Sequence, residues 1–110
     1  MIKKTIGEIE AKIRGAEAVS EERKRELLQL LATLKTEVGN LSKTDDDQAQ
    51  SIAGFANISA HEATREKQNP QLLEHSIAGL RSSVGGFEQS HPKLVQIVDR
   101  ICKTLSDLGI

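Results

Sequence analysis

The densest cluster of side chains that could do chemistry lies at residues 61–66. Within it, Glu62 and Glu66 stand four residues apart, and so do His61 and Arg65. Each pair therefore shares one face of a helix. A histidine beside a carboxylate can move protons or bind a metal ion. The second histidine of a zinc-protease helix is missing, so we interpret the cluster as an exposed or subunit-facing surface, with a ligand site as the alternative.

Glu88 and His91 have the Glu-x-x-His spacing of di-iron sites in helical bundles, where both side chains bind the same metal. Such a site needs a second copy of the motif and two further glutamates, whereas this chain has one copy. Pro92 follows His91 directly. We therefore expect Ser90 and His91 to cap the start of a helix.

Other chemical motifs are similarly incomplete. Cys102, the single cysteine, has no histidine or asparagine in a recognised nucleophile pattern, so we expect a partly buried apolar residue. The acidic run at residues 45–47 lacks the alternating oxygen ligands and central glycine of a calcium loop. Phosphate-binding glycine loops are absent, and two phenylalanines make no platform for stacking bases. The sequence thus predicts no catalytic residues and no cofactor.

Composition narrows the class of protein. Among the 110 residues, 37% are hydrophobic but only 2% aromatic, and eight Gly and two Pro are too few for a small β-barrel. A net charge of -1 gives no attraction for nucleic acids or anionic membranes. The sequence shows neither a spanning segment nor a secretory signal, and one cysteine forms no internal disulfide. We expect a cytoplasmic protein that binds neither nucleic acid nor membrane.

Five segments repeat apolar residues every three or four positions, as on one face of a helix. The five sets are Ile2, Ile6, Ile9 and Ile13; Leu27, Leu31, Leu34, Val38 and Leu41; Ala49, Ala53, Ala56, Ala60 and Ala63; Leu73, Ile77, Leu80, Val84 and Phe87; Leu94, Val98, Ile101, Leu105 and Leu108. We predict an elongated all-α fold, a four- to five-helix bundle with coiled-coil-like heptad seams. The alanine helix is expected to be largely buried, with Ile52 and Phe55 as its larger anchors.

Helix boundaries follow from capping residues. The first helix is expected to end near Arg14, before Gly15. The predicted structural residues are Ser20 and Thr44 as N-caps, Pro70 after Asn69 and Pro92 after Ser90-His91 at helix starts, and Gly109 as a C-terminal cap.

The second helix is long for a chain of this size. If it runs from residue 20 to residue 43, it is about 36 Å long, whereas a compact chain of this length has a radius of gyration of about 13 Å. Part of its apolar seam would then lack a partner in the same chain. We treat residues 1–110 as one domain, in which residues 1–43 form a helical hairpin that dimerises and residues 44–110 form the remaining helices. The predicted interface residues are Ile6, Ile9, Ile13, Leu27, Leu31, Leu34, Val38 and Leu41. A monomeric bundle with a shorter second helix is the alternative.

Residues 51–110 resemble a known family. The resemblance lies in Ser51–Arg65, Asn69–Leu73, Phe87–Pro92 with its Phe-Glu-x-Ser-His-Pro motif, and Leu105–Ile110. The sequence is similar to a small bacterial family known only as a domain of unknown function. The resemblance implies a short helical bacterial protein and brings no activity, cofactor or catalytic residue.

The sequence leaves several functions to compare. A self-associating interaction or scaffold module without catalytic activity fits the five apolar seams and is our main hypothesis. The alternative is a metal-binding or enzymatic bundle in which folding brings His61, Glu62 and His91 together. A third hypothesis is nucleic-acid association through the basic residues of the first two helices.

Overall fold

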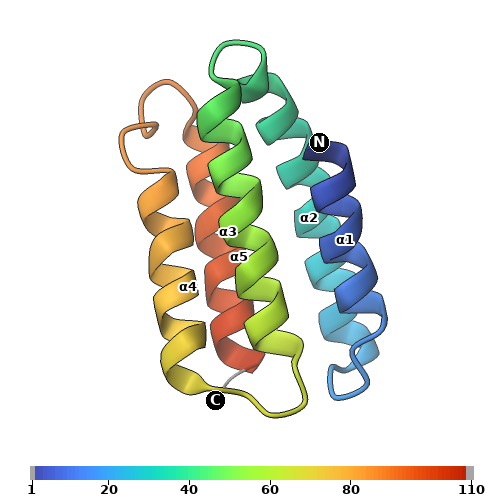
Figure 1. Cartoon of the computed structure of the whole chain (residues 1–110). Helices are drawn as coiled ribbons and strands as arrows, with labels where there is room; N and C mark the ends of the chain where they lie inside the picture. Colours follow the sequence, from blue (N-terminus) through green and yellow to red (C-terminus); the bar gives the residue numbers. More distant parts are fainter. Residues whose placement is uncertain (1, 109–110) are drawn as a thin grey trace.

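The computed structural model describes residues 2–108 and shows an all-helical bundle (Figure 1). Its helices are α1 (Ile2–Arg14), α2 (Glu21–Ser42), α3 (Asp46–Thr64), α4 (Pro70–Ser83) and α5 (Pro92–Leu108). The bundle measures 37 × 23 × 21 Å, with a radius of gyration of 12.9 Å. The predicted all-α bundle is confirmed, and it is elongated along the helices.

The helices form two layers. In Figure 1, α4, α3 and α1 lie side by side in the nearer layer, and α5 and α2 lie behind them. The helix α3 contacts each of the other helices, so its alanine stripe is the centre of the packing. Small side chains allow this because they let neighbouring helix axes approach closely.

Most predicted helix ends are confirmed. The Ser20 side chain accepts a hydrogen bond from the Arg23 backbone N–H and caps α2. The Asn69 side chain accepts from two backbone N–H groups at the start of α4, where Pro70 takes the first helical position. Pro92 begins α5 as predicted.

The predicted cap at Thr44 is wrong. Asp45 caps α3, because its Oδ1 accepts a hydrogen bond from the Gln48 backbone N–H at 3.1 Å. Thr44 instead lies in the turn that follows α2, where its hydroxyl donates to the Leu41 carbonyl. One residue of offset decides between them, since the capping oxygen must reach a backbone N–H three residues ahead. The predicted cap at Gly109 lies outside the described residues.

The chain turns after α4 earlier than its apolar stripe predicts. The helix ends at Ser83, so Phe87 lies in the following turn. Gly86 has a φ of 95°, which residues with a side chain rarely adopt. The glycine therefore allows the chain to reverse direction here.

The apolar seams of α1 and α2 are buried inside the chain's own core. All eight residues predicted at a dimer interface are at most 2% exposed: Ile6, Ile9, Ile13, Leu27, Leu31, Leu34, Val38 and Leu41. The 22 residues of α2 are about 33 Å long, which fits within the 37 Å bundle. These side chains pack against α3 and α5, so the prediction that part of the seam lacks a partner in the same chain is wrong. While this core is intact, these eight side chains are not accessible to another molecule.

Candidate functional site

The polar cluster predicted from the sequence lies at the end of α3. Glu62 is only 8% exposed, and its carboxylate accepts a hydrogen bond from Arg65 Nη1 at 3.0 Å. His61 and Glu66 are both exposed. The main interaction of the cluster is thus an ion pair that satisfies a buried carboxylate, which is a structural role.

His91 is at the opposite end of the bundle from this cluster. The Gln68 side chain, just past α3, donates to the carbonyl of Leu108, the last residue of α5, so α3 and α5 end at the same place. His91 directly precedes Pro92, the first residue of α5, and is therefore one helix length away from that end. The hypothesis that folding unites His61, Glu62 and His91 is wrong. In residues 2–108, no three His, Cys, Asp or Glu side chains are grouped as metal ligands.

His91 stabilises the turn before α5. Its Nδ1 lies 3.0 Å from the Ser90 hydroxyl, and its ring packs edge-on against Phe87 with 5.6 Å between the ring centres. Glu88 accepts a hydrogen bond from the Gly86 backbone N–H in the same turn. Because Glu88 lies in this turn, the Glu-x-x-His motif is not on one helical face. Ser90 and His91 were predicted to cap the start of α5, but their side chains contact each other and Phe87 instead.

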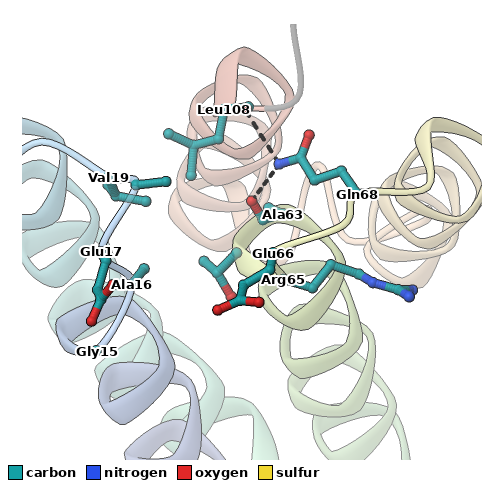
Figure 2. A pocket seen from close by; sticks show the side chains of 11 residues that line it. Gly15, Ala16, Glu17, Val19, Ala63, Arg65, Glu66, Gln68 and Leu108 are labelled. Atoms are coloured by element: carbon teal, nitrogen blue, oxygen red, sulfur yellow. Dashed lines mark hydrogen bonds between the residues drawn. The ribbon is translucent and has the colours of Figure 1, made fainter.

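A hollow of about 600 Å³ opens where the loops after α1 and α3 meet the end of α5 (Figure 2). Its walls include the apolar residues Ala16, Val19 and Leu108. The Gln68 amide donates to the carbonyls of Ala63 at 2.7 Å and Leu108 at 3.3 Å. These bonds join the loop to the ends of two helices, so the amide has a structural use.

The charged residues around this hollow do not converge. In Figure 2, Glu17 and Glu66 approach from different loops, and the Arg65 side chain extends away from Glu17. A binding pocket needs polar groups directed at one point. We therefore interpret the hollow as a space left where the loops pack over the end of the bundle, and not as a binding pocket.

Cys102 is inside the core. Burial raises the pKa of its thiol from 9.0 to about 11, so it is un-ionised at neutral pH. Its Sγ faces the Ile77 carbonyl at 4.0 Å. The predicted apolar role fits this position, because the thiolate is the reactive form of cysteine.

A more distinctive surface is formed by exposed residues of α3 and α4. We call it the α3–α4 face, and it comprises Ser51, Phe55, Ile58, Leu72, His75 and Ser82. Phe55, Ile58 and Leu72 are 38%, 52% and 45% exposed, and they are the exposed large hydrophobic side chains of the described residues. The three gather on one side of the molecule, whereas scattered apolar residues are the norm on protein surfaces.

Contact between the two helices places these residues together. A Cβ atom built on Gly79 would lie 2.4 Å from Phe55 Cε1, so the Phe55 ring rests on the glycine. Leu72 lies two turns before Gly79 on the same side of α4, and Ile58 lies one turn after Phe55 on α3. Since the helices are antiparallel, Ile58 and Leu72 lie in the same direction from the ring.

The face carries no charge. Residues 48–61 contain no Asp, Glu, Lys or Arg, although these make up 28% of the chain. The charged residues of α4, Glu74 and Arg81, line the groove toward α5, where Arg81 pairs with Asp99 at 3.9 Å. On the other side, Lys12 of α1 donates to the Asn57 side chain. Charged groups thus surround an uncharged centre, as in many protein interfaces.

Sequence reasoning did not identify this face. Phe55 was expected as a buried anchor of α3, but its ring is at the edge of the α3–α4 contact. The available signal was the run of 14 residues without a charge at 48–61. A helix whose outer face is in water normally carries charged residues on that face, so their absence indicates a different use of the surface.

Comparison with known protein families identifies the family of this chain. A family model described as "Domain of unknown function (DUF4404)" matches residues 27–110. The chain belongs to this family. The resemblance seen in residues 51–110 is confirmed at that level, and the DUF4404 match includes most of α2 and all of α3 and α4, hence the whole α3–α4 face. No curated protein and no solved structure matches the chain.

None of the helices over residues 2–108 combines the length and the apolar character needed to cross a membrane.

Proposed function

We propose that this protein is a non-catalytic interaction module that associates with itself as a homodimer. The observation that carries the proposal is the α3–α4 face, because it gathers Phe55, Ile58 and Leu72 on a surface that is otherwise rich in charge. Contiguous exposed apolar side chains surrounded by polar groups are typical of protein interaction sites. The buried seams hold the bundle together and leave this face free to bind.

The positions of the reactive side chains support a role without catalysis. Cys102 is buried with a raised pKa, and His61 and His91 lie at opposite ends of the bundle. A free buried thiol also suits a reducing compartment, so we propose the cytoplasm as the location.

The test is the mass of the purified, untagged chain in solution. We expect light scattering and sedimentation equilibrium to show a mass rising from 12.0 kDa toward twice that value as concentration increases through the micromolar range. A mass of 12.0 kDa up to about 1 mM would refute self-association. Elemental analysis of the same sample tests the absence of a metal, and stoichiometric bound metal would contradict that part of the proposal.

A further inference from the structure

We propose that the α3–α4 face is the dimer interface and binds the same face of a second copy across a twofold axis. The inference rests on the self-association proposed above and names the surface that carries it. The two copies would place α3 and α4 of one chain against α3 and α4 of the other, as a four-helix contact.

The charge distribution favours a second copy as the partner. In a twofold contact, each residue meets the same residue or its close neighbours on the other chain, so a charged face opposes like charges. The exposed side of α2 carries Glu22, Arg25 and Lys35, and that of α5 carries Arg100 and Lys103. The α3–α4 face has no charge to repel its own copy. It also offers no opposite charge to an acidic or basic peptide.

A contact that extends from the face along the whole of α3 and α4 has the size of a weak dimer. The 19 residues of α3 and the 14 of α4 are about 28 Å and about 21 Å long, and two helices side by side are about 20 Å wide. Each copy would therefore bury on the order of 500 Å², and the pair on the order of 1,000 Å². This value is near the lower limit for specific interfaces, so we expect a dissociation constant in the micromolar range.

The shape of the α3–α4 face allows the side chains of two copies to pack between one another. A Cβ atom built on Gly54 would meet no atom within 4 Å, so the surface beside Phe55 and Ile58 is open. Ile58 projects from α3 one turn further along. A glycine next to a projecting isoleucine leaves room for the other copy's side chain, as in packing of knobs into holes.

The experiment places a charge at the centre of the face. We would compare the wild type with Ile58→Glu and Leu72→Glu by sedimentation equilibrium, with circular dichroism to verify folding. Both side chains are about half exposed, so the fold should tolerate the change. We expect each variant to weaken the dimer by at least about tenfold, since two carboxylates would face each other across the axis. Ile58→Gln, which adds no charge, should weaken it less.

A matched control and a mixing experiment separate this surface from others. Ala32→Glu adds the same charge at an exposed helical position of α2 and should leave the dissociation constant unchanged. An equal mixture of Ile58→Glu and Ile58→Lys should form mixed dimers, because opposite charges then meet. A dimer that withstands Ile58→Glu and Leu72→Glu would overturn this inference and leave the proposed function intact. A wild type that is monomeric throughout would overturn both.

Discussion

The contact between Phe55 and Gly79 gives a sharp test of how α3 and α4 pack. A methyl group at position 79 would come within 2.4 Å of Phe55 Cε1 and 2.6 Å of Cδ1. Carbon atoms in contact are about 3.5 to 4.0 Å apart, so Gly79→Ala forces the ring to move by about 1 Å or more. The ring can turn toward solvent, since Phe55 is already 38% exposed.

The magnitude follows from the area that the ring loses. A buried phenylalanine covers about 200 Å², of which roughly 120 Å² is covered here. At about 25 cal/mol per Å², the whole burial of this ring is worth about 3 kcal/mol, and losing half or more of it costs about 1.5 to 3 kcal/mol. Replacing glycine by alanine inside a helix returns about 1 kcal/mol. We therefore expect Gly79→Ala to lower the free energy of unfolding by about 0.5 to 2 kcal/mol.

Two controls isolate the clash. Gly7 lies in the middle of α1, where an added Cβ meets no atom within 4 Å, so Gly7→Ala should raise stability by about 0.5 to 1 kcal/mol. In a Phe55→Ala background, Gly79→Ala should also become stabilising. Urea denaturation followed by circular dichroism measures all four variants. If Gly79→Ala stabilises the wild type as much as Gly7→Ala does, the reasoning is refuted.

Four further predictions concern the caps, the buried ion pair, the reactivity of the thiol and its effect on the pH dependence of stability. Asp45→Ala should lower the unfolding free energy by about 1 kcal/mol, and Thr44→Ala by clearly less, since Asp45 makes the capping bond of α3; equal losses in urea denaturation would contradict this assignment. Arg65→Ala should cost about 1 to 2 kcal/mol in the same assay, because it leaves the buried Glu62 carboxylate without its partner, and Arg65→Lys should recover part of the loss. Dithionitrobenzoate should modify Cys102 at least about a hundredfold more slowly in the native protein than in urea, and equal rates would show an accessible thiol. The pKa of the Cys102 thiol is 9.0 in the unfolded chain and about 11 in the folded one, so between these values the folded state retains a proton that the unfolded state has lost. The free energy of unfolding should therefore fall as pH rises through this interval, and it should fall less in Cys102→Ala.

Local signals in the sequence predicted most of the helix ends. Ser20, Asn69 and the two prolines act through atoms within three or four residues, so their roles can be read without knowing the fold. Thr44 and Asp45 are adjacent, and both can cap a helix, so the pattern did not decide between them. Which of the two residues caps α3 depends on where α2 ends.

The helical character of the chain and the apolar side of each helix could be predicted from the amino-acid sequence, because the spacing of Ile, Leu, Val and Ala fixes an amphipathic face. The sequence did not determine which helices those faces meet. Tertiary structure decided that the seams of α1 and α2 are covered by α3 and α5 of the same chain, and that His61 and His91 are kept apart. It also decided that Phe55, Ile58 and Leu72 share an outer face, since the antiparallel contact at Gly79 brings together residues of two separate helices. Periodicity describes one helix at a time, whereas an interaction surface depends on how helices are placed beside one another.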